Sequence, residues 1–420
     1  MNKRHYLTLA AATLAVSLWL GVAVAQQTAP APAATETKAV ETKAVEVANA
    51  TDAAKPATAA STGNKLADAI AKAPRGTEPG MIDETKPTGF LGIPGAPNVS
   101  IILAFAWAVW VGWIFSTVGA FGGVMAGVGH MSVFGFGSYA GGLKKTAPEL
   151  GKIVTDSIKA SNQFLVGTSA AISSFNYLKM KRLVLPLAIS LGLGSLLGAY
   201  GAAALSAGKL DFKSYQGYFG LFVLFLGCWL FYQTTPGAKS KQKTAKEAAK
   251  AFEDAVKKQK CGEKVEECNL GLKIQRFTMA TCEFTFYGVP FHFNPLVPFL
   301  GGIVISAVAA FLGVGGGFLL VPFLTSVTQL PMYLAAGTSA LAVLVSMITS
   351  IITLISKGTP IEWHLVGIEL VGITLGSIVG PMTSKYLSDA LMKRIFIVLS
   401  LYIGLGYTLA GFVGIKIPGV

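Results

Sequence analysis

Residues 311–322 read FLGVGGGFLLVP, and residues 335–340 read AAGTSA. The glycines at 315–317 stand between apolar runs, where a backbone without Cβ atoms can turn sharply. A turn inside an apolar segment predicts a broken membrane helix, which is tolerated only where the break is buried or lines a cavity. The next half-helix would begin near Phe318, and the positive end of its dipole favours an anion.

The same signals occur in the same order earlier in the chain. GAFGG at 119–123 corresponds to GVGGG at 313–317, and GTSA at 167–170 corresponds to GTSA at 337–340. A third pattern, Leu-Gly-Ser followed by Gly, occupies 193–198 and 375–380. Three matches in register predict an internal duplication, although the earlier copy carries extra residues between its first two signals.

The composition is typical of a membrane protein. Hydrophobic residues make up 52% of the chain and charged residues only 13%, where a soluble protein has about a quarter charged residues. Apolar runs of roughly 20 residues are long enough to cross about 30 Å of hydrocarbon. We count ten apolar segments, at 98–118, 119–142, 163–180, 183–206, 216–233, 296–313, 315–328, 334–356, 364–384 and 393–414.

The sequence divides into five parts. Residues 1–25 resemble a cleavable signal peptide, with an uncleaved anchor as the alternative, and residues 26–97 predict a disordered periplasmic tail. A first transmembrane repeat covers 98–233, a polar insertion 234–294, and a second repeat 295–420. The insertion contains a helical stretch from Ala245 to Lys260. The predicted fold is therefore all-α and polytopic, with two repeats of about five segments and Gly-broken half-helices.

Charge distribution predicts the topology. With the tail outside and five crossings in each half, the Lys-rich insertion would lie in the cytoplasm, together with Lys179, Lys181, Arg182, Lys385, Lys393 and Arg394. This arrangement satisfies the positive-inside rule and makes the two repeats inverted. Four crossings per half would instead place the most basic loop outside. In the cytoplasm, Cys261 and Cys268 of the insertion would stay reduced.

Small polar residues beside the glycine breaks predict an anion site. Hydroxyl and backbone N–H donors suit an ion with several acceptor oxygens, and the absence of fixed charge lets the ion leave again. The predicted substrate-binding residues are Gly122, Gly123, Gly167, Thr168, Ser169, Gly315, Gly316, Gly317, Gly337, Thr338 and Ser339. The alternative is that these small residues only allow close helix packing, and we assign that role to the Leu-Gly-Ser patterns.

Two ionisable residues lie within the apolar segments. His130 is in the second segment and Glu369 is in the ninth. Charge inside a membrane is costly, so each residue is a candidate for function. We predict that Glu369 couples transport to protons. His130 is either a ligand contact in the substrate site or a hydrogen-bonded packing residue.

The glycine break and the Gly-Thr-Ser-Ala of the second half resemble the sulfite exporter TauE/SafE family of membrane permeases. The resemblance covers roughly 98–233 and 295–414 and is much closer in the second half. It implies a secondary transporter of sulfur-containing anions such as sulfite, sulfoacetate or organosulfonates, in the cell inner membrane. In the first half, Met125 to His130 replace the Leu-Val-Pro continuation.

Other functions remain open from the sequence alone. A membrane sensor or assembly subunit would use the tail and the insertion to bind partners, and a carrier of a different anion is a further alternative. The segments contain no metal-ligand cluster and no paired carboxylates, so we predict no enzyme activity, cofactor or metal. The expected partners are a small anionic substrate and the lipid bilayer, not nucleic acid. A homo-oligomer is left open.

Overall fold

The computed structural model describes residues 65–420 apart from 120, 207–211, 236–242, 261–270, 279, 312–316, 416 and 418–420. The predicted signal peptide and the first part of the tail lie outside the described residues. So do Gly315 and Gly316 of the second break, and Cys261 and Cys268 of the insertion.

The part of the chain up to residue 233 is helical. Its elements are α2 (Lys65–Lys72), η1 (Phe90–Gly92), α3 (Ile101–Val118), α4 (Gly122–Val128), η2 (Gly129–Val133), α5 (Phe136–Thr146), α6 (Pro148–Lys179), α7 (Leu185–Ser206) and α8 (Phe212–Gln233). The second predicted segment is therefore split into α4, a π turn and α5. Proline at the first position of α6 suits a helix start, because the proline ring already has a helical φ angle.

The insertion holds one helix and the only described strands. These are α10 (Lys243–Lys260), β1 (Leu272–Phe277), β2 (Cys282–Phe286) and β3 (Val289–Phe293), and the strands form an antiparallel sheet in the order β1-β2-β3. The helix confirms the prediction for 245–260, whereas the sheet was not predicted. Its buried side chains alternate along β2, where Cys282, Phe284 and Phe286 face inward.

The chain after the insertion is helical again. Its elements are α11 (Leu296–Phe311), α12 (Gly317–Ser326), α13 (Met332–Ser356), α14 (Trp363–Ser384), α15 (Asp389–Thr408) and η5 (Leu409–Val413). Four helical segments in the described residues are long and apolar enough to cross a membrane: 101–118, 332–356, 363–384 and 389–413. Shorter apolar helices lie at 185–201, 217–233, 296–308 and 317–326.

Helices of one half pack against helices of the other half, and the contacts are reciprocal. Helix α3 packs against α14, and α7 packs against α11 in the corresponding way. Helix α6 contacts both α13 and α14, while α13 contacts both α6 and α7. Helix α8 packs against its counterpart α15. Each contact has a counterpart in which the two halves are exchanged, as a two-fold relation between the halves would give.

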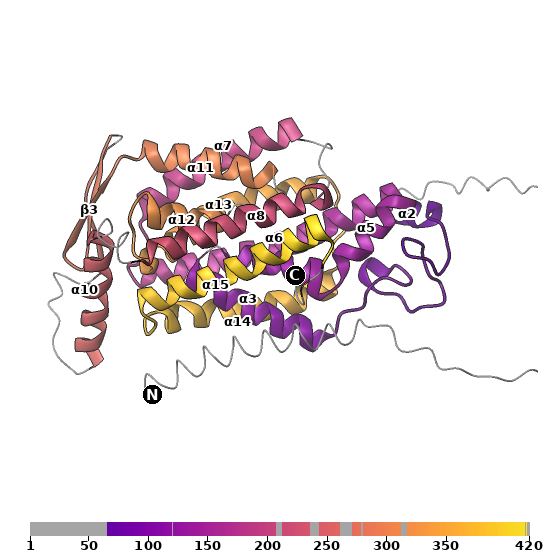
Figure 1. Cartoon of the computed structure of the whole chain (residues 1–420), viewed down its shortest axis with the longest axis horizontal. Coiled ribbons are helices and arrows are strands. Elements are labelled where there is room, and N and C mark those ends of the chain that lie inside the picture. The colour runs from indigo at the N-terminus through magenta and orange to yellow at the C-terminus, as the bar shows by residue number, and fades with distance from the viewer. Residues whose placement is uncertain are drawn as a thin grey trace, which may run out of the picture.

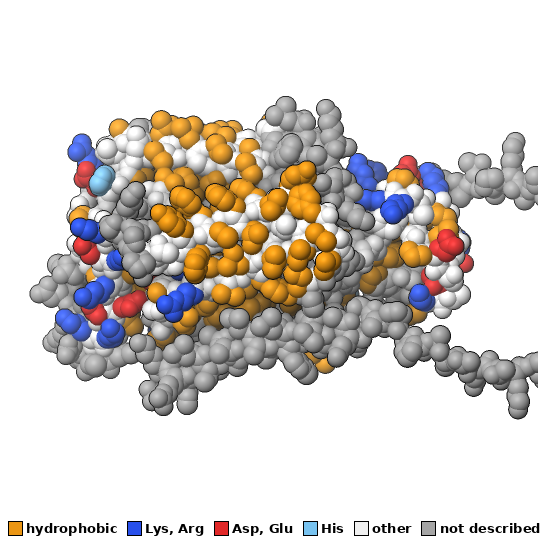
Figure 2. All heavy atoms as spheres, in the orientation of Figure 1, with side chains coloured by type: hydrophobic (Ala, Val, Ile, Leu, Met, Phe, Trp, Pro, Cys, Tyr) orange, Lys and Arg blue, Asp and Glu red, His pale blue; other side chains and the backbone are white. Residues whose placement is uncertain are grey.

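The bundle has two chemically distinct ends (Figure 1). The insertion lies at one of them, which we call the insertion end, and residues 65–97 lie at the other, which we call the opposite end. Between them, Figure 2 shows a broad band of hydrophobic side chains, with charged residues gathered beyond it. Phe225, Val304 and Ile352 are each more than 60% exposed, as lipid-facing side chains would be.

Residues 65–97 differ from the predicted disordered tail. They form α2, a compact loop and η1, and Ile82, Phe90 and Ile93 are buried in the core. The Phe90 ring packs on Phe136 of α5 with centroids 4.3 Å apart, and the Leu91 N–H donates to Glu362 at 2.8 Å. A few large apolar side chains therefore anchor this stretch on the bundle, although its average composition resembles that of a disordered segment.

Glycines bring the paired helices into backbone contact. A Cβ atom at Gly376 of α14 would lie 2.1 Å from the Val109 carbonyl oxygen of α3. A Cβ atom at Gly194 of α7 would likewise lie 2.0 Å from the Phe299 carbonyl oxygen of α11. Small residues let membrane helices approach closely. These contacts support the packing role that the sequence assigned to the Leu-Gly-Ser patterns.

Gly376→Val should destabilise the protein strongly. The new side chain has no space against the α3 backbone, and overpacking costs about 1–3 kcal/mol or more. Thermal unfolding of the purified protein in detergent would measure the loss. The matched control is Gly367→Val in the same helix, where a Cβ atom has no neighbour within 4 Å. Equal unfolding temperatures for the two variants would contradict this packing.

Candidate functional site

Polar side chains are buried where α3, α6 and α14 meet. On α14, Glu369, Ser377 and Ser384 are each fully buried. Their spacings of eight and seven residues place them on one face of the helix. With a rise of 1.5 Å per residue, they extend over about 22 Å, most of the thickness of a bilayer core. We call the following residues the polar file: Ser116, His130, Ser169, Ser173, Tyr177, Arg182, Glu369, Ser377 and Ser384.

A histidine and a glutamate form the ionisable part of the file nearer the opposite end. His130 Nε2 lies 3.2 Å from Glu369 Oε2, and both side chains are buried. His130 sits in the π turn η2, a distortion often found at functional positions. His130 Nδ1 and Glu369 Oε1 have no hydrogen-bond partner among the described residues. The structure therefore joins the two ionisable residues that the sequence singled out separately.

A cavity of about 130 Å³ adjoins this pair at the opposite end. Phe136 lines the cavity and also stacks on the His130 ring, with centroids 6.3 Å apart. Ile368, the neighbour of Glu369, lines it from the other side. Glu362 and His364, at the start of α14, are also in its wall. Phe136 therefore contacts both the cavity and the His130 ring.

Hydroxyl groups continue the file toward the insertion end. Ser169 and Ser377 Oγ atoms are 2.7 Å apart, and Ser116 and Ser173 Oγ atoms are 2.6 Å apart. The Tyr177 hydroxyl donates to the Ser116 carbonyl. Ser169, Ser173 and Tyr177 recur every four residues along α6, so they share one face of that helix.

The file ends at Arg182 in the α6–α7 connection. Arg182 is only 2% exposed, and its Nη1 donates to Ser384 Oγ at 3.1 Å. The rings of Tyr177, Phe252 and Tyr333 surround its guanidinium group. The sequence counted Arg182 only as a topology-setting loop residue, since nothing in the Lys-Met-Lys-Arg run distinguishes it from its exposed neighbours.

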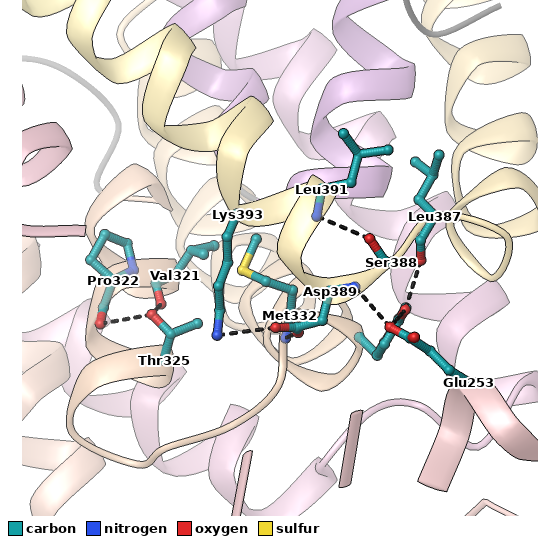
Figure 3. A network of polar contacts seen from close by, with 11 residues as sticks. Glu253, Val321, Pro322, Thr325, Met332, Leu387, Ser388, Asp389, Leu391 and Lys393 are labelled. Atoms are coloured by element: carbon teal, nitrogen blue, oxygen red, sulfur yellow. Dashed lines mark hydrogen bonds and ion pairs between the residues drawn. The ribbon is translucent and has the colours of Figure 1, made fainter. Parts of the chain in front are cut away.

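The insertion is fastened over this end by a polar network (Figure 3). Glu253 of α10 accepts hydrogen bonds from the Tyr333 hydroxyl at 3.0 Å and from the Asp389 N–H at 3.2 Å. Asp389 in turn accepts from the Met332 N–H at 2.6 Å and pairs with Lys393 at 3.0 Å. The network joins α10 to the starts of α13 and α15.

The first glycine break lies against the second half of the chain. A Cβ atom at Gly119 would lie 2.6 Å from Val321 of α12 and 3.0 Å from the Ser339 hydroxyl of α13. Gly122 packs on Phe115, and Gly123 faces Val166 beside Gly167. Gly317 begins α12 and is buried. The first break is therefore a neighbour of the second Gly-Thr-Ser element across the two halves.

The two Gly-Thr-Ser elements lie at different depths. Gly337 packs against Tyr177, whereas Gly167, ten residues earlier on α6, packs against Met347 and Ile351. Ten residues correspond to about 15 Å along a helix. Thr338 accepts a hydrogen bond from the Val184 N–H at 3.2 Å, and Thr168 is only partly buried. Because α6 and α13 run in opposite directions, the same motif lies on opposite sides of the midpoint of this helix pair. The two Gly-Thr-Ser elements therefore do not form one shared ring of donors.

Ser169 and Ser377 carry different predicted roles but share a hydrogen bond. The sequence assigned Ser169 to the anion site and Ser377 to packing. Because their hydroxyls are joined, a substitution at either one disturbs the other. The binding roles of the predicted site residues stay predictions. Within the described ranges, no three His, Cys, Asp or Glu side chains are grouped as metal ligands.

Comparison with known proteins gives one match. The family model described as Sulfite exporter TauE/SafE matches residues 103–407. This range includes every helix from α4 to α14, nearly all of α3 and α15, and the whole insertion. No curated protein and no solved structure matches the chain.

Proposed function

The chain belongs to the sulfite exporter TauE/SafE family, and from that premise we propose that it is a secondary transporter that exports a small sulfur-containing oxyanion across the inner membrane. Members of this family are membrane transporters, so the chain is a multi-pass membrane protein. The proposed substrate class is sulfite, sulfoacetate or an organosulfonate.

The polar file is the observation that carries this proposal. Buried hydroxyl, imidazole, carboxyl and guanidinium groups are costly inside an apolar bundle. Helices that served only as membrane anchors would not need them. Along the file, hydroxyl groups provide donors without fixed charge, which lets an anion bind and leave. Ser169, Ser173 and Ser377 are the hydroxyl groups at the centre of this route.

The His130–Glu369 pair is the proposed proton carrier. Glu369 was the predicted coupling residue. Its contact with His130 gives it a partner that can accept a proton from it or donate one to it. Phe136, which stacks on His130, lines the cavity at the opposite end, and we propose that protons reach the pair from this side. An anion that moves with a proton crosses the membrane with less net charge, which lowers the electrical cost of the step.

We also propose that the two halves are inverted repeats. The reciprocal pairing of α3 with α14 and of α7 with α11 supports this, as does the position of the insertion at the end away from residues 65–97. The basic insertion would then face the cytoplasm, and residues 65–97 the periplasm. In such carriers the halves rock against each other around a central site.

Cysteine labelling tests this orientation. Lys257 of α10 and Lys72 of α2 have side chains that are 66% and 73% exposed, so a cysteine at either position is reachable from its own side. In a background where the four native cysteines are replaced by serine, an impermeant maleimide should label Lys72→Cys in intact spheroplasts but label Lys257→Cys only after lysis. The reverse pattern would invert the proposed topology.

A competition assay tests the substrate class. Purified protein in liposomes should take up radiolabelled sulfite, and unlabelled sulfite should compete more strongly than sulfate, thiosulfate or taurine. Stronger competition by thiosulfate or taurine would redirect the substrate assignment within the same carrier function. No saturable uptake of any of the four compounds would contradict the proposal.

A further inference from the structure

Arg182 is a buried cation without a charged partner. Of its donor groups, Nη1 binds Ser384, whereas Nε and Nη2 have no hydrogen-bond acceptor among the described residues. No carboxylate in the described part of the chain forms an ion pair with it. A buried guanidinium group that lacks acceptors is unfavourable, so its retention needs an explanation.

Aromatic rings explain only part of its environment. The guanidinium carbon lies 5.0 Å from the ring centroids of Tyr177 and Phe252, and 5.2 Å from that of Tyr333. Ring faces stabilise the positive charge, but they offer no lone pairs to the N–H groups at the edge of the guanidinium plane. Two donors on adjacent nitrogens remain available, which is the geometry that recognises two oxygens of one anion.

The nearby carboxylates are already engaged elsewhere. Glu253 accepts from the Tyr333 hydroxyl and the Asp389 N–H, and Asp389 pairs with Lys393 (Figure 3). The network therefore engages Glu253 and Asp389 in contacts other than an ion pair with Arg182, and the free edge of the guanidinium group is left for another acceptor.

We propose that Arg182 is the anion-binding residue at the insertion end of the polar file. The ligand class is an oxyanion with at least two oxygens on one face, such as a sulfite or sulfonate group. That the anion bound by Arg182 is the transported substrate rests on the proposed function. Arg182 is the last member of the file before the insertion, so an anion would meet it on arrival from that side or on departure toward it.

Helix α10 controls access to this residue. Phe252 covers the guanidinium group, and the adjacent Glu253 fastens α10 to α13 and α15. In this proposal, movement of Phe252 opens one side of the guanidinium group to an anion. The insertion therefore acts as a cover over the binding residue, and its fastening determines how readily the cover opens.

Anion-dependent thermal stability tests the site. The purified full-length protein is titrated with sulfite, and separately with sulfate, against chloride at constant ionic strength. In Arg182→Gln, the sulfite concentration that gives half of the maximal rise in melting temperature should increase at least about tenfold. Loss of a charge-assisted hydrogen bond has an effect of this size. Arg182→Lys should retain only part of the effect, because a lysine lacks the two-pronged donor edge.

The matched control is Arg394→Gln. Arg394 is an exposed residue of α15 near the same end, and its loss changes the net charge equally. It should leave the sulfite response unchanged. Phe252→Ala, which removes the cover, should lower the sulfite concentration for half-maximal stabilisation and provides a second test if Arg182→Gln does not fold.

Two results would overturn the site. One is an unchanged sulfite response in Arg182→Gln and Arg182→Lys, and the other is a response that Arg394→Gln weakens as much as Arg182→Gln does. If Arg182→Gln does not fold, an unchanged response in Phe252→Ala would also count against it. The outcome separates this site from the transport proposal: sulfite stabilisation that depends on Arg182, without flux in liposomes, would leave the site standing and refute transport.

Discussion

Glu369→Gln is expected to abolish flux that is driven by a pH gradient. The glutamine side chain keeps the size of the glutamate and can still hydrogen-bond His130 across the 3.2 Å contact, but it cannot take up or release a proton. A loss of about a hundredfold or more in pH-driven sulfite flux is expected, because one member of the proposed proton relay is removed and general acid–base groups contribute on this scale. Sulfite binding in the thermal assay should persist.

The fold should survive this substitution. Gln at position 369 leaves His130 with a hydrogen-bond partner, whereas Glu369→Ala would leave a buried imidazole nitrogen unpaired at about 1–3 kcal/mol. Glu149→Gln is the control, since its exposed side chain lies at the opposite end outside the polar file. Proteoliposome flux with and without an imposed pH gradient measures the effect. Equal pH-driven flux in the wild type and Glu369→Gln would rule out proton transfer at this residue.

Gly337→Ala is expected to reduce flux at least about tenfold. Its Cβ atom would lie 2.7 Å from the Arg182 carbonyl oxygen and 2.8 Å from Tyr177 Cβ, so the α6–α7 connection must shift. Overpacking of this kind costs about 1–3 kcal/mol. It also displaces the backbone that positions Arg182, and small misplacements at a site have large effects on rate.

Gly201→Ala of α7 provides the matched control from outside the predicted site. A Cβ atom at this position has no neighbour within 4 Å. Sulfite flux and sulfite-dependent melting temperature should both remain near wild-type values in this variant. If Gly201→Ala is as damaging as Gly337→Ala, the effect does not depend on Arg182.

The positions of the membrane helices were predictable because each corresponds to a long apolar run in the sequence. The predicted segment 334–356 corresponds to α13 (Met332–Ser356), and 364–384 corresponds to α14 (Trp363–Ser384). In a membrane, the backbone must satisfy its own hydrogen bonds, so a long apolar run has few alternatives to a helix. The same argument does not apply to 65–97, where a few side chains such as Ile82 and Phe90 decide the structure through contacts with distant residues.

The candidate site was predictable only in its separate members. The cost of burying an ionisable group identified His130 and Glu369, but their pairing joins residues 239 positions apart. The repeated glycine motifs identified elements that do become neighbours, as Gly119 and Ser339 show. Arg182 was missed because a basic residue after a membrane helix usually faces water, and its burial results from α10 packing over it.

The central claim is that this chain carries a small sulfur oxyanion across a membrane. Its most direct test is efflux of radiolabelled sulfite from liposomes that contain the purified protein. We expect saturable efflux well above that of protein-free liposomes, accelerated by a pH gradient in the wild type and not in Glu369→Gln. Efflux from folded wild-type protein that equals protein-free leakage at every sulfite concentration would contradict the account.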